Sequence, residues 1–263
     1  MRDPHVVVSV LAASAAVVAG AMVFVLLRVR RTGEVSVIDT VWGAGFAAIS
    51  LIGLAITWDS TGNELRILLA VLVTAWGLRL TQHIGRRSRG AGEDERYADL
   101  FERHAGGRMR TAALWVCLPQ GLAMWFISLP VQLAQASTAS VRWWVIPGVG
   151  LWLVGVFFES VGDAQLARFR ADPANRGHVL DTGLWRYTRH PNYFGDACVW
   201  WGFYVCAASA PAAAVAFLSP VAMTWLLVRG TGKPLMETHL EHRPGYAEYV
   251  RTTSGFVPLP PRK

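Results

Sequence analysis

The residues best suited to chemistry lie in one polar stretch of the chain, residues 159–196. Its second half, residues 183–196, reads GLWRYTRHPNYFGD. Pro191 fits the first turn of a helix. Asn192 and Asp196 are then four residues apart and share one helix face. An amide and a carboxylate on one face suit a ribose, an amide or the edge of an adenine ring.

Basic side chains directly precede this predicted helix. At a helix start the free N–H groups and the helix dipole already favour anions. Added cations suit a pyrophosphate or a 2′-phosphate. The alternative for each arginine is pairing with lipid phosphates. The residues that carry this prediction are Arg186, Arg189 and His190.

Further candidates flank that segment on both sides. Glu159, Asp163 and Arg170 fall on one helix face by their spacing. In the C-terminal tail, Glu237 is the best candidate for a ligand contact. Two nearby tyrosines, Tyr246 and Tyr249, are predicted to pack in the core. The tail is expected to form an amphipathic helix.

The N-terminal half offers three candidate proton donors. Asp39 stands at the start of a predicted span, where the alternative is that it caps the helix. Tyr97 follows an acidic run, residues 93–95. His83 shares a helix face with Arg79 and Arg87, and the alternative there is a basic belt at the membrane surface.

The elements that must position these residues are predicted to be membrane helices. Of the 263 residues, 53% are hydrophobic and only 16% are charged, against about a quarter charged in soluble domains. This composition excludes a disordered chain, a coiled coil, a collagen and a disulfide-stapled secreted scaffold. We therefore predict an all-α polytopic membrane protein, one domain over residues 1–263. Its seven expected spans cover residues 6–27, 37–58, 64–82, 111–134, 143–162, 192–210 and 212–228.

The basic residues predict the orientation of these spans. All 25 Lys and Arg residues except Arg2, Arg66 and Arg142 fall on one side of the expected membrane. By the positive-inside rule this side is cytoplasmic and the N-terminus lies outside. The net charge of +7 is thus a topology signal rather than a nucleic-acid footprint. No metal site is expected, because the three cysteines lie in apolar stretches and are interpreted as core residues.

With these motifs in place, the chain resembles a family of membrane reductases. The run GLWRYTRHPNYFGD and the tail segment GYAEYV, with its closing aromatic and prolines, are similar to the superfamily of steroid 5α-reductases and sterol reductases. The resemblance covers residues 145–260 well and the first 140 only in general layout. The segments DTVWG, LRLTQHI and EDERY resemble a bacterial branch of that superfamily.

The resemblance implies NADPH as cofactor and hydride delivery to an activated C=C bond of a lipid. By position, Asn192 and Asp196 match the family's cofactor-contacting Asn and acid. Asp163 and Arg170 match an Asp and an Arg of the preceding stretch, and Tyr187 matches a Tyr before the motif. The family's catalytic acid–Tyr pair is not assigned here, and its His and Tyr before the tail fall opposite Gly232 and Met236. Residues 1–140 are interpreted as the substrate side and 141–263 as the cofactor-binding region.

Two other interpretations remain open from the sequence. Isoprenylcysteine carboxyl methyltransferases share RHP, a downstream Glu and a Tyr-rich tail, and imply S-adenosylmethionine instead. The Asn directly after RHP and the earlier Asp163 and Arg170 favour the reductases. A membrane scaffold without activity would not need this set of residues. The expected protein is a multi-pass enzyme of the inner (plasma) membrane that acts on a hydrophobic lipid, with no nucleic acid and no obligate protein partner.

Overall fold

The computed structural model describes residues 4–58, 62–104, 106–230 and 232–262. Within these ranges every regular element is a helix and none is a strand, so the predicted all-α class is confirmed. Arg2, one of the three basic residues expected outside, lies beyond the described residues.

The number of spans differs from the seven that the sequence predicts. Five described helical segments are long and apolar enough to cross a membrane, and a sixth span results if one bent pair of helices is counted as one. The predicted span 192–210 is the helix α9, Pro191–Ala207, of only 17 residues. At about 1.5 Å per residue this length is at the lower limit for the ~30 Å hydrocarbon core. The five segments are Pro4–Thr32, Val37–Thr57, Glu64–Arg87, Val145–Ala171 and Pro211–Thr238.

The chain divides into two compact units, whose boundaries fall within or beside helices. Unit 1 comprises Met1–Trp143 and Cys206–Ser219, and unit 2 comprises Trp144–Val205 and Pro220–Lys263. Unit 1 contains α1 Pro4–Thr32, α2 Val37–Thr57, α3 Glu64–Arg87, α4 Glu95–Arg103, α5 Arg108–Thr111, the π-helix η1 Ala112–Cys117, α6 Leu118–Ile127, α7 Leu129–Gln135, α10 Pro211–Ala214 and the 3-10 turn η4 Val215–Phe217. Unit 2 contains α8 Val145–Ala171, the 3-10 turns η2 Pro173–Asn175 and η3 Gly183–Arg186, most of α9, most of α11 Leu218–Val228, α12 Lys233–Leu240 and α13 Tyr246–Thr252.

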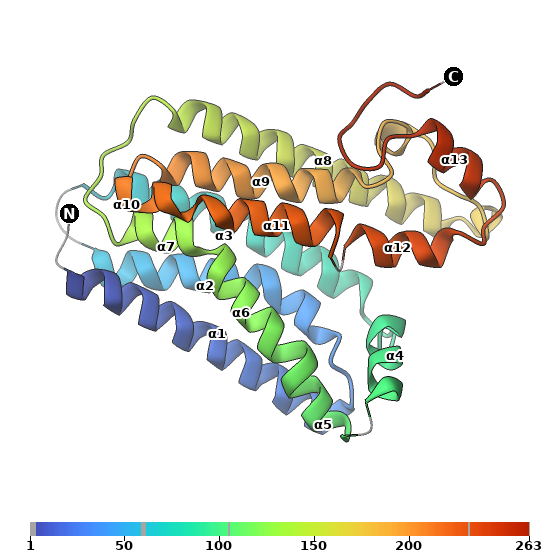
Figure 1. Ribbon diagram of the computed structural model, residues 1–263, viewed down its shortest axis with the longest axis horizontal. Coiled ribbons are helices and arrows are strands. Elements are labelled where there is room, and N and C mark those ends of the chain that lie inside the picture. Colours follow the sequence, from blue (N-terminus) through green and yellow to red (C-terminus); the bar gives the residue numbers. More distant parts are fainter. Residues whose placement is uncertain (1–3, 59–61, 105, 231, 263) are drawn as a thin grey trace. The chain divides into compact units, whose positions relative to one another are not determined.

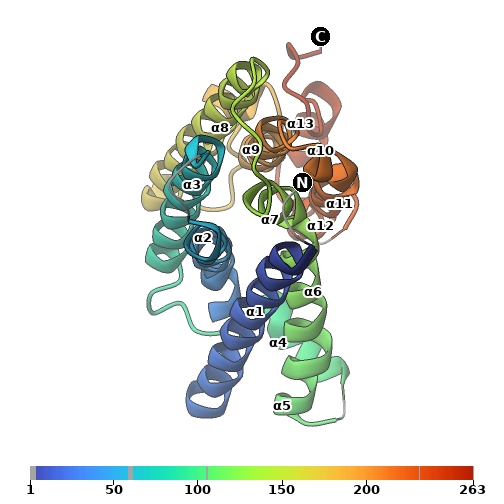
Figure 2. The same cartoon turned by 90° about the vertical axis from the view of Figure 1, so that its left-hand side faces the viewer.

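In unit 1, α2 packs against both α1 and α3 (Figures 1 and 2). The crossing of α2 and α3 depends on two facing glycines. A Cβ on Gly43 would lie 2.2 Å from the carbonyl oxygen of Gly77, and a Cβ on Gly77 would lie 2.4 Å from that of Gly43. Small residues let helix backbones approach closely in membranes. The pair therefore lets the backbones of α2 and α3 approach each other closely where the two helices cross.

The C-terminal end of α2 is closed by a basic side chain. Arg66, 1% exposed, donates hydrogen bonds to the carbonyl oxygens of Thr57 and Gly62. A cation at a helix C-terminus stabilises the helix dipole. Arg66 thus makes its hydrogen bonds inside unit 1 and does not lie at the surface.

The fourth predicted span, 111–134, is bent. Arg108–Ile127 and Leu129–Gln135 meet at 47°. Pro130 lies at the start of α7 and has no N–H, which breaks the helical hydrogen-bond ladder. The carbonyl oxygen of Phe126, four residues earlier, instead accepts a 2.9 Å hydrogen bond from the hydroxyl of Ser219.

In unit 2, a second pair of glycines brings α8 and α9 together. A Cβ on either Gly155 or Gly195 would lie 2.6 Å from the other residue's carbonyl oxygen. Gly155 is thus a packing residue of α8, whereas a Cβ on Gly150 would meet nothing within 4 Å. This close approach places the acidic end of α8 beside the start of α9.

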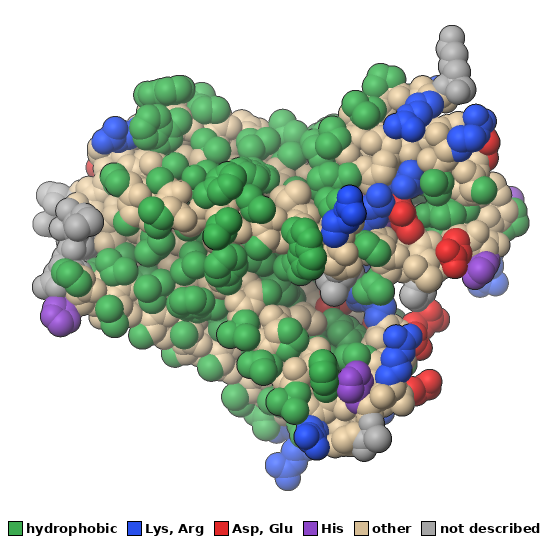
Figure 3. Space-filling view, viewed as in Figure 1, with side chains coloured by type: hydrophobic (Ala, Val, Ile, Leu, Met, Phe, Trp, Pro, Cys, Tyr) green, Lys and Arg blue, Asp and Glu red, His purple; other side chains and the backbone are tan. Residues whose placement is uncertain are grey.

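The surface and core agree with a membrane protein. Large apolar side chains are exposed along several helices, among them Phe24, Leu122 and Leu153. On the face shown in Figure 3, hydrophobic side chains cover much of α6, while charged side chains gather around α4 and α5 at one end of unit 1. The three cysteines are buried, as their apolar surroundings predict.

Candidate functional site

In unit 1, Asp39 and Tyr97 are joined directly. Asp39 lies in the first turn of α2, and its Oδ1 accepts a 2.7 Å hydrogen bond from the hydroxyl of Tyr97. Its Oδ2 accepts from Nη2 of Arg96, also at 2.7 Å. The N-cap position of α2 is Ser36, so the helix-capping alternative for Asp39 is wrong. The carboxylate instead faces a buried phenol.

The phenol of Tyr97 belongs to a longer chain of hydrogen bonds. Gln120 on α6 donates its amide N–H to the Tyr97 oxygen at 3.2 Å. The amide oxygen of Gln120 accepts a 2.7 Å bond from the indole nitrogen of Trp42. Since an indole only donates, it fixes which end of the amide faces Tyr97. The order of donation therefore runs from Trp42 through Gln120 and Tyr97 to Asp39.

The loop before α4 positions Tyr97 against α2. The carboxylate of Glu93 accepts hydrogen bonds from the N–H groups of Val35 and Ser36, at 2.7 and 2.9 Å. Asp94 caps α4 by accepting from the N–H of Arg96 at 3.0 Å. The acidic run thus anchors the loop to the start of α2 and begins the helix that carries Tyr97.

Burial keeps Tyr97 protonated. Its side chain belongs to the buried core, and burial, with the nearby Asp39 carboxylate, raises the pKa of the phenol well above its ordinary value. Arg96 is also partly buried. Burial disfavours its charge, but hydrogen bonding to Asp94 and the charge of Asp39 outweigh this effect and raise the pKa of Arg96. At neutral pH the cluster therefore contains a neutral phenol that donates to Asp39.

The third candidate donor, His83, lies half-buried on α3. Sequence reasoning missed Gln120, which the structure places at the centre of the chain of hydrogen bonds. The sequence does contain a signal for Gln120, which is a lone amide in the apolar run LWVCLPQGLAMWF. Polar groups inside membrane spans are costly, so such a residue is a functional candidate by default.

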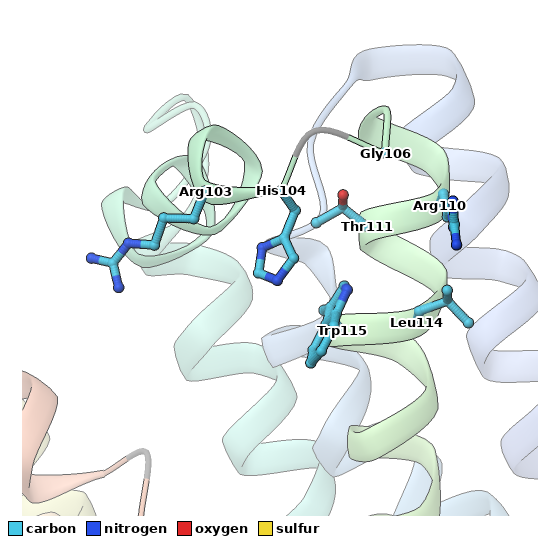
Figure 4. A pocket seen from close by; sticks show the side chains of 7 residues that line it. All are labelled: Arg103, His104, Gly106, Arg110, Thr111, Leu114 and Trp115. Carbon is cyan, nitrogen blue, oxygen red and sulfur yellow. The ribbon is translucent and has the colours of Figure 1, made fainter.

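A separate cavity of about 310 Å³ opens in unit 1 beside α5. His104 faces Trp115 across it, with ring centroids 4.7 Å apart, while Arg103 points away (Figure 4). None of the described residues that line it belongs to the predicted catalytic set.

In unit 2, the helices α8 and α9 bring together residues predicted to bind a cofactor. Oδ1 of Asp163 lies 3.4 Å from Nδ2 of Asn192, at the start of α9. Glu159, one turn earlier on α8, is 2% exposed and packs against Gly195. Asp196 lies half-buried one turn beyond Asn192. An amide–carboxylate pair of this kind can bind the hydroxyls of a ribose.

The RHP segment and the tail meet at Glu237. Its Oε1 accepts a 2.8 Å hydrogen bond from Nε of Arg189 and lies 3.1 Å from Nε2 of His190. The imidazole of His190 is stacked on the ring of Tyr193, with the two planes 2° apart. Burial lowers the pKa of His190, so its imidazole is neutral at pH 7 and donates from Nε2 to the carboxylate.

The tail is also tied to this segment through its backbone. Nη1 of Arg189 donates to the carbonyl oxygens of Thr253 and Val250, at 2.7 and 3.1 Å, at the end of α13. The hydroxyl of Thr188 donates to the carbonyl of Phe256 at 2.8 Å. The tail thus contains two short helices, α12 and α13, rather than one. Tyr249 is buried there as predicted.

Three further predicted residues lie at the surface of unit 2. The side chains of Arg170, Arg186 and Tyr187 are exposed. Tyr187 contributes its carbonyl oxygen, which accepts from the N–H of Leu259 at 3.0 Å. The structure therefore gathers Asp163, Asn192, Arg189, His190 and Glu237 around the start of α9.

Comparison with known proteins adds a family. The model of the family described as "Protein of unknown function (DUF1295)" matches residues 23–253, nearly the whole chain. The chain belongs to this family. It is also 30% identical over 113 residues to the 3-oxo-5-alpha-steroid 4-dehydrogenase 1 of Homo sapiens and to that of Macaca fascicularis. The matched part is 43% of this chain and 40% of each relative, so it spans about two fifths of their length. No solved structure matches significantly.

Proposed function

We propose that this protein is a membrane-embedded, NADPH-dependent reductase of a C=C bond in a hydrophobic lipid. The sequence similarity to two proteins named as dehydrogenases of a 3-oxo steroid supports oxidoreduction beside a carbonyl group. The observation that carries the proposal is the bond between Tyr97 and Asp39. It supplies an acid–Tyr pair of the kind that the resemblance requires and that the sequence left unassigned.

The pair suits the reduction of an enone. Hydride addition to a C=C bond conjugated with a carbonyl places negative charge on the carbonyl oxygen, and a preorganised donor stabilises that charge. Tyr97 is a neutral donor. When its hydrogen turns from Asp39 to the substrate oxygen, Gln120 still donates to the phenol oxygen and holds the ring in place.

Besides the hydride, the reaction consumes one proton, which comes from water. Tyr97 gives its proton to the substrate oxygen, and the resulting enol takes a proton from water at the α-carbon as it returns to a ketone. The proton released from the enol oxygen returns to the phenol of Tyr97, and Asp39 carries this proton in between. The net change is one hydride and one proton added across the C=C bond.

Residues of unit 2 fit a dinucleotide. Bound NADPH supplies the hydride from its nicotinamide ring. The pair Asp163–Asn192 offers an acceptor and a donor for ribose hydroxyls, and Arg189 offers positive charge for a phosphate. Asp196, Glu237 and the exposed Arg170 and Arg186 complete the set of candidate contacts.

The substrate class follows from the setting of the catalytic cluster. Asp39 lies in the first turn of one membrane helix, and Gln120 lies within the bent span. A molecule that reaches this cluster from the bilayer is a sterol-like, isoprenoid or fatty-acyl lipid. Purified protein should oxidise NADPH with a lipid enone and much less with a water-soluble enone of the same reactivity. Equal rates with both would remove the lipid from the proposal.

The cofactor separates this proposal from its main alternative. Thermal unfolding of the protein in detergent should be shifted upward by NADPH, less by NADH and not by S-adenosylmethionine. Stabilisation by S-adenosylmethionine alone would establish the methyltransferase interpretation and end the reductase proposal.

A further inference from the structure

Two cationic groups of unit 2 converge on one glycine. A Cβ on Gly255 would lie 2.7 Å from Nζ of Lys233 and 3.2 Å from Nη2 of Arg189. Gly255 has no positive φ, so its backbone conformation does not require glycine. The lack of a side chain instead leaves room for the ammonium and the guanidinium beside the same point of the tail.

The surrounding residues do not neutralise both cations. Oε1 of Glu237 accepts from Nε of Arg189 and is close to Nε2 of His190, which is neutral. Nη1 of Arg189 is used by two backbone carbonyls. Within the described part of the chain, Nη2 of Arg189 and Nζ of Lys233 make no hydrogen bond or ion pair. One carboxylate therefore faces two cations, and both cations keep donors available.

A buried hydroxyl gives a second, independent indication. The side chain of Tyr246 is only 5% exposed, and among the described residues its hydroxyl has no hydrogen-bond partner. Buried polar groups without a partner are rare in folded proteins and call for an explanation. Burial, together with the charge of Glu237, raises the pKa of Tyr246 to about 12, while Arg189 acts in the opposite direction. The phenol is thus a neutral donor within electrostatic range of the same guanidinium.

We infer that Arg189, Lys233 and Tyr246 form a phosphate-binding site, with its space kept open by Gly255. A guanidinium, an ammonium and a hydroxyl are three kinds of donor, and a phosphate group has enough oxygens to accept from all of them. The bound phosphate belongs to the dinucleotide cofactor, and this assignment rests on the proposed function. A phospholipid headgroup carries the same chemistry, so the experiment distinguishes the two sources.

The test measures binding to the full-length protein in detergent by calorimetry. The probes are inorganic pyrophosphate and 2′,5′-ADP. Loss of one charged hydrogen bond of this type corresponds to about a ten- to hundredfold loss of affinity. We expect that loss for Lys233→Gln and a smaller loss for Tyr246→Phe. Arg251→Gln is the matched control, because Arg251 is exposed, pairs with Glu248 and lies on the same short helix as Tyr246. It should change affinity less than about twofold.

A double-mutant cycle separates a local site from general loss of charge. Gly255→Ala places a methyl group where the ammonium lies, and the flexible lysine side chain has to move away. Its effect and that of Lys233→Gln should therefore not add, whereas the effects of independent sites do. Binding should also depend less on salt in Lys233→Gln than in the wild type. Unchanged melting temperatures of the unliganded variants confirm that they are folded.

The outcomes distinguish this site from the reductase proposal. If Lys233→Gln and Tyr246→Phe bind both probes as tightly as the wild type does, the phosphate site is wrong, even if NADPH is oxidised normally. If the probes bind with the expected dependence but no lipid enone supports NADPH oxidation, the site stands and the reductase fails. If the protein binds nanodiscs that contain phosphatidic acid in a Lys233-dependent way but binds neither of the two probes, the phosphate belongs to a phospholipid. The assignment to a cofactor is then overturned.

Discussion

Tyr97 donates its phenolic hydrogen to Asp39 across 58 positions of the sequence, at 2.7 Å. The two residues meet because Glu93 binds the N–H groups of Val35 and Ser36 just before α2. The acidic run of residues 93–95 therefore anchors the proposed catalytic pair through Glu93. Removal of Glu93 should affect activity through Tyr97 without contact to any substrate.

Tyr97→Phe should reduce turnover with a lipid enone about a hundredfold or more, the usual scale for a lost general acid. Asp39→Asn should have a similar effect, because an amide cannot take up the proton. Both variants should bind NADPH as the wild type does, since the predicted cofactor contacts lie in unit 2. The measurement is single-turnover NADPH oxidation with separate titration of the cofactor. Near-wild-type turnover in Asp39→Asn would exclude Asp39 from the mechanism.

Gln120→Leu tests whether the phenol must be held in place. The leucine fills similar space but donates no hydrogen bond to Tyr97 and accepts none from Trp42. The hydrogen bond from Gln120 favours the ionised phenol, so its loss raises the pKa of Tyr97 further. We expect turnover to fall about tenfold, on the scale of one hydrogen bond of about 1.4 kcal/mol. Gln120→Glu, which can still accept from Trp42, is the comparison. A wild-type rate in Gln120→Leu would contradict a positioning role.

The sequence predicts much of this site at the level of residues but little of its contacts. Asp39 is recognisable as an acid at the start of a predicted span, and Tyr97 as a phenol that follows an acidic run. Their pairing is not, because it depends on a loop that returns to the start of α2. Gln120 shows the same limit. Its amide is visible in an apolar run, yet only the register of α6 against α2 shows which groups it joins.

In the C-terminal segment, too, the sequence predicts residues but not their contacts. Arg189 and His190 stand out as cations before a helix, which predicts anion binding. In the structure Nε and Nη1 of Arg189 bind the tail, and only Nη2 remains available. The sequence does not predict Lys233 or Gly255 as site residues, because neither belongs to a motif. Their relation to Arg189 is set by the path of the tail, which local patterns do not encode.

The predicted orientation can be tested at the two ends of one helix. The described helix α3 runs from Glu64 to Arg87, between Asn63 and Ala91. Its 24 residues are long enough to cross a bilayer. Single cysteines at positions 63 and 91, in a background without the native cysteines, should react with membrane-impermeant maleimide from opposite sides, with position 63 outside. Labelling of both from the same side would reject this topology.

Gly155→Ala should destabilise unit 2 strongly, because its Cβ would lie 2.6 Å from the carbonyl oxygen of Gly195, a backbone atom that cannot rotate away. Gly150→Ala is a matched control on the same helix, since its Cβ would meet nothing within 4 Å. That control should be neutral or slightly stabilising, as alanine favours a helix by up to about 1 kcal/mol over glycine. Thermal unfolding in detergent measures both. Equal melting temperatures would show that the glycine contact does not limit the packing of α8 and α9.

The neutral His190 predicts how stability depends on pH. Burial lowers its pKa in the folded protein, partly offset by Glu237, and the charges of Arg189 and Lys233 act in the same direction as burial. In the unfolded chain the imidazole titrates near its ordinary pKa of about 6.5. Below that pH the unfolded state binds more protons, so the contribution of His190 is complete above about pH 6.5 and is lost as the pH falls through the lowered pKa. The melting temperature of the wild type should therefore fall on acidification within this window.

His190→Gln keeps a donor for Glu237 but does not titrate, so its melting temperature should fall less over the same window. Parallel curves for the two proteins would show that the charge state of His190 does not control the contact between the RHP segment and the tail.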